Sequence, residues 1–422
     1  KTDSFYLSVG ITGIMRILDV LGLERRAEQR NDGYERRVRR LRAQAWQEVD
    51  PVLLWIPILL MFFGLIMVYS ASIALPDSPK FHNYSRYHFF IRHGLSLTVG
   101  FSVAIFAFNV SSDNWQKLAP VMFLIALFLL IIVLIPHVGL RVNGARRWLP
   151  LGFMNFQPSE MMKLAACIYV ADYCVRKNQD LRVFNKGVLP MIVVLGLVSI
   201  LLLLEPDMGA LMVIAVITMG VIFLGGVNFK VFGALFASMV AAFAALVIVT
   251  PWRARRIFAY LDPWKDENAQ NGAYQLTQSL IAFGRGELWG QGLGSSVQKM
   301  FYLPEAHTDF IMAVVGEEFG LLGVWVVILA FVVLVRRIFM VARESMAFER
   351  NFQALATQGV GIWLGVQGFI NMGVNMGMLP TKGLTLPFIS YGGSALLFNC
   401  LAMAFVLRVD YENRRLKRGE PV

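Results

Sequence analysis

The chain has 422 residues, of which 57% are hydrophobic and 16% are charged, and its formal net charge is +11. Soluble domains contain roughly 45–50% apolar and about 25% charged residues, so the composition argues against an ordinary soluble protein. The apolar residues are gathered into blocks of about 20, the length at which a helix crosses the hydrocarbon core of a bilayer. The sequence therefore predicts a polytopic membrane protein.

Ten apolar blocks follow one another along the chain. They are longer than strands and lack alternation with a period of two, and backbone groups in lipid must be satisfied within the segment, so each block is predicted to be a helix. The predicted spans are 51–73, 89–109, 118–136, 158–175, 188–204, 207–226, 230–250, 308–335, 354–378 and 388–408. The predicted fold is all-α, with about ten transmembrane helices and a large extracytoplasmic loop between the seventh and the eighth.

The basic residues fix the predicted orientation of these spans. With the N-terminus inside, the predicted cytoplasmic pieces hold 25 of the 39 Lys and Arg residues, although the loops between spans are together longer on the outside than on the inside. This is the positive-inside bias, which predicts that both termini are cytoplasmic. A nucleic-acid-binding protein would instead carry its cations on one folded face, so we expect no nucleic-acid partner.

Three parts are expected. Residues 1–50 form a basic cytoplasmic tail, residues 51–409 form the ten-helix membrane domain, and residues 410–422 form a charged cytoplasmic tail. Within the membrane domain, the long outside loop 251–307 carries many aromatic residues and is expected to fold against the membrane surface. Its residues 275–283 have helical spacing, which a glycine-rich stretch then breaks.

One acid stands where the long outside loop enters the eighth span. Asp309, after His307 and Thr308, is placed at the outer end of a predicted helix. Thr308 or Asp309 is expected either to cap that helix or, in the case of Asp309, to take a proton from a lipid-linked substrate. The residues alone leave these two interpretations equal.

Three further acidic sites lie in or between spans. Glu317 and Glu318, deeper in the eighth span, are expected to form ion pairs within the bundle. Glu160 and Lys163 are three residues apart and are predicted to pair, or else Lys163 contacts a phosphate that Glu160 orients. The reversal at residues 205–207 is expected to cap the sixth span or to bind a divalent cation, for which two acids are a weak signal.

Several cations on the outer side run against the charge bias. An anionic lipid diphosphate would account for them, because guanidinium groups match phosphate geometry, and contact with lipid headgroups is the alternative explanation. They are Arg146, Arg147, Arg253, Arg255, Arg256, Arg285, Lys299 and Lys382.

Four motifs carry a resemblance to a known family. They are GAYQLTQSL at 272–280, GRGELWGQGLG at 284–294, YLPEAHTDF at 302–310 and PTKGLTLPFISYGGS at 380–394. From about residue 50 to the end, the chain resembles the SEDS family of shape, elongation, division and sporulation proteins, and Lys382 favours its division branch. Two positions depart from the family pattern, since Ala395 replaces a usual Ser and Met312 a usual Phe.

The resemblance implies a peptidoglycan glycosyltransferase that polymerises lipid II into β-1,4 glycan strands at the outer face of the inner membrane, during septal wall synthesis. Asp309 matches the essential acid of the family and is the candidate general base of an inverting displacement. Cations, or a divalent metal such as Mg²⁺ or Mn²⁺, would neutralise the leaving diphosphate. The candidate substrate-binding residues are Lys382, Arg146, Lys163, Glu160, Arg285, Lys299, His307 and Ser394.

The resemblance also implies partners and leaves two rival functions. The expected partners are lipid II, the nascent glycan strand, a class B penicillin-binding transpeptidase and other membrane proteins of the division machinery. One rival is a lipid II flippase, which needs a polar route through the bilayer midplane. The other is a scaffold without chemistry of its own, which would keep its function when Asp309 is lost.

Overall fold

The computed structural model describes residues 48–421, apart from 80, 143, 151, 153–154, 182, 266–267 and 269–271. At residues 252, 253 and 256 it describes the backbone alone. The basic N-terminal tail falls almost wholly outside these residues, so the predictions for it stay untested. The architecture is therefore that of the membrane domain.

The described elements follow a simple order along the chain. They are α3 (Pro51–Ser72), η1 (Leu75–Asp77), α4 (His88–Phe108), α5 (Ser112–Leu134), β1 (Leu140–Val142), β2 (Ala145–Pro150), β3 (Asn155–Phe156), α6 (Pro158–Arg176), the π-helical turn η2 (Phe184–Val188), α7 (Leu189–Leu204), α8 (Met208–Leu224), α9 (Phe229–Ile248), α10 (Pro251–Leu261), α11 (Tyr274–Gly286), α12 (Ile311–Ala347), α13 (Asn351–Asn375) and α14 (Gly393–Lys417).

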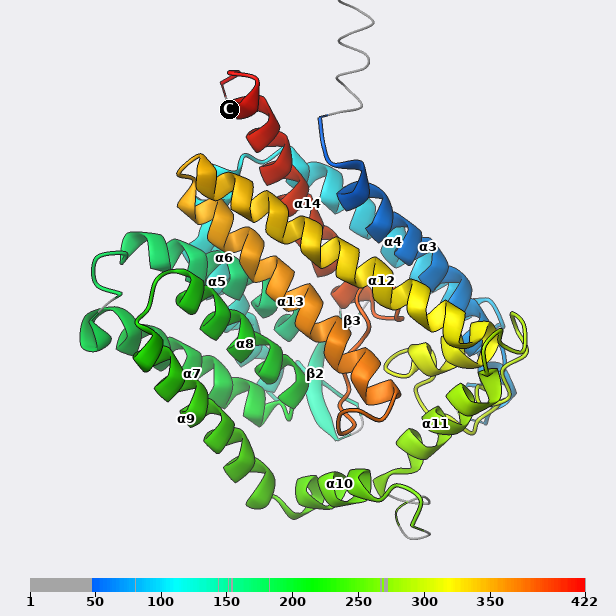
Figure 1. The fold of residues 1–422 in the computed structure, drawn as a ribbon. Helices are drawn as coiled ribbons and strands as arrows, with labels where there is room; N and C mark the ends of the chain where they lie inside the picture. Colours follow the sequence, from blue (N-terminus) through cyan, green and yellow to red (C-terminus); the bar gives the residue numbers. More distant parts are fainter. Residues whose placement is uncertain are drawn as a thin grey trace, which may run out of the picture. The chain divides into compact units, whose positions relative to one another are not determined.

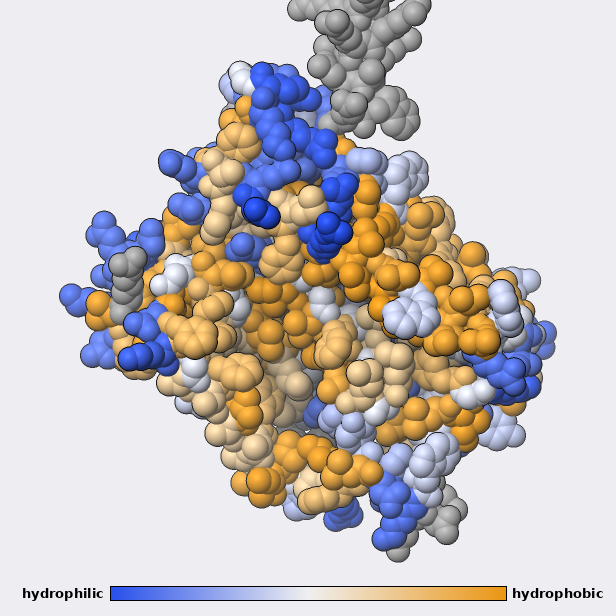
Figure 2. All heavy atoms as spheres, viewed as in Figure 1, coloured by the Kyte–Doolittle hydropathy of each residue, from blue (hydrophilic) through white to orange (hydrophobic). Residues whose placement is uncertain are grey.

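Each of the ten predicted spans overlaps one of these helices, which confirms the all-α membrane fold. Seven helical segments in the described part of the chain are long and apolar enough to cross a bilayer. The other three predicted spans correspond to α6, α8 and α13, which are shorter or more polar. Figure 2 shows apolar side chains over much of one face, with hydrophilic residues gathered at the C-terminal end of α14.

The three exceptions are the central helices of the bundle. In α13, 19 of 25 residues are buried, and α6 and α8 pack against α13 and against each other. A helix surrounded by other helices does not meet lipid, so its sequence can carry polar residues that pair inside the protein. The opposite case is α9, which has no buried residue and lies apart from α12 and α13 (Figure 1).

The long outside loop folds back onto the bundle, and the predicted helix at 275–283 is found as α11. The residues that follow α11 form backbone hydrogen bonds with α12 at the point where that helix is interrupted, at Gly320, whose φ is +64°. The amide of Leu321 donates to the carbonyl of Glu287 at 2.9 Å, and the amide of Gly292 donates to the carbonyl of Glu318 at 3.0 Å. A Cβ atom at Gly320 would lie 2.4 Å from the amide nitrogen of Gly290, so only glycine lets the two backbones approach this closely.

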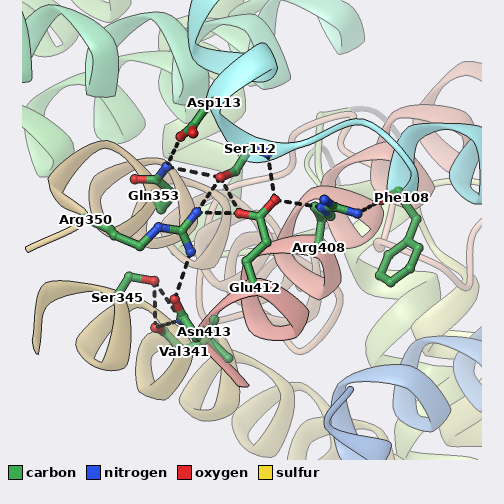
Figure 3. Close-up of polar contacts among 10 residues, drawn as sticks. All are labelled: Phe108, Ser112, Asp113, Val341, Ser345, Arg350, Gln353, Arg408, Glu412 and Asn413. Atoms are coloured by element: carbon green, nitrogen blue, oxygen red, sulfur yellow. Dashed lines mark hydrogen bonds and ion pairs between the residues drawn. The ribbon is translucent and has the colours of Figure 1, made fainter. Parts of the chain in front are cut away.

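The predicted cytoplasmic ends of five helices meet in a buried polar cluster, shown in Figure 3 and called here the inner-face network. Its centre is Glu412, which accepts from the amide of Ser112 at 3.0 Å, from Arg408 at 2.6 Å and from Arg350. Its other members are Phe108, Asp113, Val341, Ser345, Gln353 and Asn413. The network ties α4, α5, α12, α13 and α14 together.

Three helices extend well beyond the predicted spans. α5 begins at Ser112 rather than at 118. α12 continues to Ala347 rather than ending at 335, and α14 continues through the predicted C-terminal tail to Lys417. Hydropathy detects only the lipid-facing part of a helix, whereas the polar residues beyond it remain helical because they pack and pair at the inner-face network.

Candidate functional site

A cavity of about 550 Å³ lies on the predicted outer side of the bundle. It is enclosed by α4, by the β1–β2 hairpin, by the first turns of α6 and α8, and by the segments that precede α12 and α14. The polar residues that line it are Arg92, Ser96, Arg147, Asn155, Gln157, Glu160, Asp207, Gln275, Glu305, Thr308, Asp309, Thr381, Lys382, Thr385 and Tyr391.

Asp309 lies in this cavity, two residues before α12 begins and outside the membrane-spanning helix. Burial and the nearby carboxylate of Glu305 raise the pKa of Asp309 from 3.8 to about 7, against the opposing effect of Arg147. No group in the described part of the chain forms a hydrogen bond with its carboxylate. A carboxyl that titrates near neutral pH and has no such partner is suited to accept a proton from a bound hydroxyl.

The expectation that Thr308 or Asp309 caps the eighth span is wrong. The hydroxyl of Thr308 turns back to the Glu305 side chain at 2.9 Å, and α12 begins after Phe310 with no side-chain cap from its own segment. The cap comes from another helix, since the side-chain oxygen of Asn375 accepts from the amide of Ala313 at 3.1 Å. Because α13 does the capping, the Asp309 carboxylate is left for the cavity.

Asp207 is a second acidic residue that lines the cavity, and it caps α8 as expected. It accepts from the amide of Ala210 at 3.2 Å, from the hydroxyl of Ser159 at 2.9 Å and from the side-chain amide of Gln157 at 3.1 Å. Its carboxylate is therefore well supplied with donors and is held in one orientation.

Arg147 lines the same cavity as these two acids, and its positive charge acts on Asp309. Its guanidinium donates to the backbone carbonyl of Glu205 at 3.1 Å and to that of Pro206. The Glu205 side chain is fully buried, and neither of its oxygens finds a hydrogen-bond partner among the described residues. Burial, with a further contribution from Asp207, raises the pKa of Glu205 to about 9, so it is protonated at neutral pH.

Of the predicted substrate-binding residues, Lys382 and Glu160 line the cavity. Lys163 is completely buried behind Glu160 and confirms the predicted pair, with its ammonium 2.8 Å from the carboxylate. Ser394 lies beneath the cavity, where its hydroxyl donates to the carbonyl of Asn155 and accepts from the amide of Gln157, both at 3.0 Å.

Two other predicted residues take part in packing beside the cavity. Arg146 turns toward α5, where its guanidinium lies 3.5 Å from the carbonyl of Leu134. His307 is buried against the rings of Phe89 and Tyr391. Neither residue lines the cavity.

The remaining two predicted cations belong to the helix break. Arg285 donates to Glu317 at 3.0 Å, and Lys299 lies 2.8 Å from Glu318 and 2.9 Å from the hydroxyl of Ser70. The expectation that Glu317 and Glu318 form ion pairs within the bundle is confirmed. Because Arg285 and Lys299 hold the outside loop in place there, the geometry does not place them at the cavity.

Several residues that line the cavity were not among the predicted substrate-binding residues, for example Arg92, Gln157 and Asp207. Arg147 also lines it, and it was predicted only as one of the outer cations that an anionic lipid diphosphate would explain. Successive residues of a strand face opposite sides, so only one of the adjacent Arg146 and Arg147 in β2 faces the cavity. Which one does so depends on the register of the hairpin, which the sequence does not specify.

The cavity carries several acids, yet no group of three or more His, Cys, Asp or Glu side chains is close enough to hold a metal ion in the part of the chain that the structure describes. Asp207 and Glu160 are already engaged by protein donors. A divalent cation therefore stays a proposal, and the cations that the chain itself supplies to the cavity are Arg92, Arg147 and Lys382.

Comparisons with known proteins identify the family of the chain. The family model described as cell cycle protein, of the FtsW, RodA and SpoVE type, matches residues 51–415. The chain is 61% identical to a probable peptidoglycan glycosyltransferase FtsW from Burkholderia thailandensis over 89% of this chain and 81% of the relative. It is 55% identical to a protein of the same name from Polynucleobacter necessarius over 88% of each.

Two solved structures share the fold. The rod shape determining protein RodA of Thermus thermophilus superposes with a TM-score of 0.63 at 27% identity, over 87% of this chain and 99% of RodA. A chain from a peptidoglycan synthase complex, described as coordinating polymerization and crosslinking, gives a TM-score of 0.69 at 26% identity, over 86% of this chain and 98% of that one. The chain therefore belongs to the SEDS family of cell cycle proteins, in the branch whose members are named FtsW.

Proposed function

We propose that this chain polymerises lipid II into β-1,4 glycan strands at the outer face of the inner membrane, with Asp309 as the general base. The chain is a peptidoglycan glycosyltransferase of the division type, as its FtsW relatives are named. The observation that carries the proposed mechanism is the Asp309 carboxyl, whose pKa is raised to about 7 in a cavity that also contains Lys382 and Arg147.

The chemical step follows from the substrate. The donor sugar is α-linked to a lipid diphosphate and the product is β-linked, so one inverting displacement is sufficient. The acceptor 4-hydroxyl oxygen attacks the anomeric carbon, its proton passes to Asp309, and the bond to the diphosphate breaks with both electrons leaving on the phosphate oxygen. A positioned general base typically contributes about 10²–10⁴ to the rate of such a step.

The developing negative charge on the leaving diphosphate requires cations. Lys382 and Arg147 line the cavity and are assigned this role, because fixed positive groups stabilise charge that grows in the transition state. Glu160, held by Lys163, is assigned to orient the sugar. Ser394 is assigned a supporting role beneath the cavity floor.

The flippase alternative is less well supported. Alternating access would require the helices to part on the cytoplasmic side, where Glu412, Arg350 and Arg408 lock five helices together. Removing one partner of such a buried pair costs about 3–5 kcal/mol, which makes opening at this end unfavourable. The inner-face network instead supports a rigid bundle that presents one cavity to the outer side.

Partners and location complete the proposal. We assign a class B penicillin-binding transpeptidase as partner, alongside other division membrane proteins, because the similar chain in the synthase complex is described in terms of both polymerization and crosslinking. The excess of Lys and Arg in the predicted cytoplasmic pieces supports cytoplasmic termini. The division-type relatives support placement at the septum.

The test is polymerisation of purified lipid II in detergent, with the transpeptidase partner present. Wild-type protein is expected to give glycan strands, and folded Asp309→Asn protein is expected to give none above background. Detergent leaves no bilayer across which to transport lipid II, so strands identify a polymerase. No strands from the wild type, in a complex whose transpeptidase is active, would favour the flippase or the scaffold. Normal glycan strands from the Asp309→Asn protein would show that Asp309 is not the general base.

A further inference from the structure

Three buried amide side chains form a ladder along one face of α13. Gln367, Asn371 and Asn375 are four residues apart, so they lie above one another on the helix surface. Their exposed fractions are 0%, 2% and 0%. Every polar atom of these side chains has a hydrogen-bond partner, since none is among the unpaired buried atoms of the described residues.

The middle rung, Asn371, joins the two segments that meet at the cavity. Its side-chain nitrogen donates to the backbone carbonyl of Asp309 at 2.8 Å and to the backbone carbonyl of Leu384 at 2.6 Å. Leu384 is two residues after Lys382, in the segment that precedes α14. One amide group therefore holds the candidate base and the candidate diphosphate-binding segment at the same time.

The other two amide side chains of the ladder, Asn375 and Gln367, bind the same two segments. Asn375 donates to the carbonyl of Asp309 at 3.0 Å and caps α12 through Ala313. Gln367 donates to the carbonyl of Thr385 at 2.9 Å and accepts from Lys163 at 2.7 Å. Asn375, at the outer end of the ladder, therefore binds the segment that contains Asp309, and Gln367, at the inner end, binds the segment that contains Thr385.

The two segments touch where the ladder brings them together. A Cβ atom at Gly383 would lie 3.0 Å from the Oδ2 atom of Asp309, so the backbone at Gly383 lies directly against the carboxylate. Further hydrogen bonds join the same segments, from the hydroxyl of Ser390 to the carbonyl of Thr308 at 2.6 Å and from the amide of Tyr391 to the carbonyl of His307 at 3.0 Å.

A primary amide is the side chain that suits the middle rung. It offers two N–H donors from one nitrogen, whereas a hydroxyl offers one and a carboxylate none. Without Asn371, the carbonyl of Leu384 loses this donor and the carbonyl of Asp309 keeps only the one from Asn375. Buried carbonyls without donors are unfavourable, so the segments would shift to find new partners. A displacement of about 1 Å between reacting groups can cost 10²-fold in rate.

We propose that Asn371 is a positioning residue that sets the separation between Asp309 and the segment that carries Lys382. The proposal rests on the proposed function, because it assigns Asn371 to the same cavity without giving it contact with the substrate. It predicts a loss mainly in kcat, since the substitution alters the distance between the base and the segment that carries Lys382 but removes neither group. It also predicts that Asp309 becomes better solvated when the ladder is broken.

The experiment compares Asn371→Leu with Asn399→Leu. Asn399 is an equally buried asparagine in α14, with an exposed fraction of 1%, and its side-chain oxygen has no hydrogen-bond partner among the described residues. Asn371→Ser, which keeps one donor, provides a milder variant that preserves folding. All are purified as complexes with the transpeptidase partner, and thermal stability, polymerisation kinetics and backbone hydrogen exchange are measured on each.

Asn371→Leu is expected to lower kcat by roughly 10–10²-fold with KM for lipid II nearly unchanged, and Asn371→Ser by less. The acid limb of its pH–rate profile should move to lower pH, and hydrogen exchange should quicken in residues 303–310 and 380–391. Asn399→Leu should show none of these changes at a similar loss of thermal stability.

Unchanged exchange in both segments of Asn371→Leu, or an equal fall in kcat in Asn399→Leu, would overturn the positioning role. A different outcome separates the two claims. If the wild type makes no glycan while Asn371→Leu still loosens both segments, the proposed function is wrong, and so is the predicted effect of Asn371 on kcat. The same result would still confirm that Asn371 holds the two segments together.

Discussion

Two buried carboxylates at opposite ends of the bundle have opposite surroundings. Glu412 on the inner side accepts hydrogen bonds from Ser112, Arg350 and Arg408 and has no exposed surface. Asp309 on the outer side has no hydrogen-bond donor to its carboxylate among the described residues, and its pKa is raised to about 7. Hydrogen bonds and positive charges compensate Glu412 for its burial, whereas no hydrogen bond from the described residues compensates the carboxylate of Asp309.

The contrast separates stability from chemistry. A compensated carboxylate holds helices together, and its protonation state is fixed. An uncompensated one costs folding free energy, but it can exchange a proton near neutral pH, as a general base must. The two ends of the same bundle should therefore respond differently to the same kind of substitution.

The largest expected effect on stability is at the inner side. Glu412→Gln leaves Arg350 and Arg408 partly buried without their counter-charge, which is expected to cost on the order of 3 kcal/mol of folding free energy. Thermal unfolding of the purified complex measures this loss. The matched variant Asp309→Asn should unfold no earlier than the wild type, because it removes an uncompensated buried charge. A larger loss of stability in Asp309→Asn than in Glu412→Gln would contradict the comparison.

The next effect concerns the cations of the cavity. Lys382→Met is expected to lower the polymerisation rate by about 10²-fold, the usual cost of removing one group that stabilises transition-state charge. Lys382→Arg keeps the charge and should retain more activity. Initial polymerisation rates with saturating lipid II measure both, and equal rates for Lys382→Met and the wild type would exclude a role in charge stabilisation.

A smaller effect is expected where the backbone touches the base. Gly383→Ala adds a Cβ atom 3.0 Å from the Oδ2 atom of Asp309, closer than most contacts of this kind. The carboxylate must turn aside, so we expect a fall of roughly tenfold in kcat, within the range for small displacements of reacting groups. Gly284→Ala, at an open position with no atom within 4 Å, provides the control. An unaffected rate in Gly383→Ala would show that the carboxylate has room to move.

The smallest effect is a change in pH dependence at Glu205. Because its pKa is raised from 4.5 to about 9 in the folded protein, the folded state binds more protons than the unfolded state between these values. Stability should therefore fall as pH rises through this window, and Glu205→Gln should reduce that fall. Melting temperatures at pH 6 and pH 9 measure the difference, and parallel declines in both proteins would mean that Glu205 is ionised at neutral pH.

Much of the fold could be predicted because hydropathy and charge bias act on long segments. The ten helices, the α11 helix and the Glu160–Lys163 pair all follow from local spacing. The ends of α12 and α14 were missed because their polar residues pair with distant partners at the inner-face network. The helix break at Gly320 was missed because its cause lies in a loop about 30 residues earlier in the chain.

The candidate site was predicted less completely, and the reason is geometric. The position of Asp309 followed from a motif, whereas the role of Asn375 as the cap of α12 depends on contact between helices far apart in sequence. The choice between Arg146 and Arg147 depends on strand register. Lys299 and Arg285 carry the expected charge, but their acidic partners in α12 take them away from the cavity.

The pH–rate profile of polymerisation tests the central claim most directly. Initial polymerisation rates with saturating lipid II would be measured from pH 5 to pH 9 on the wild-type complex. A base with a pKa of about 7 predicts that the rate rises tenfold per pH unit below that value and levels off above it. A rate that is flat between pH 5 and pH 9 would contradict the assignment of Asp309 as the general base.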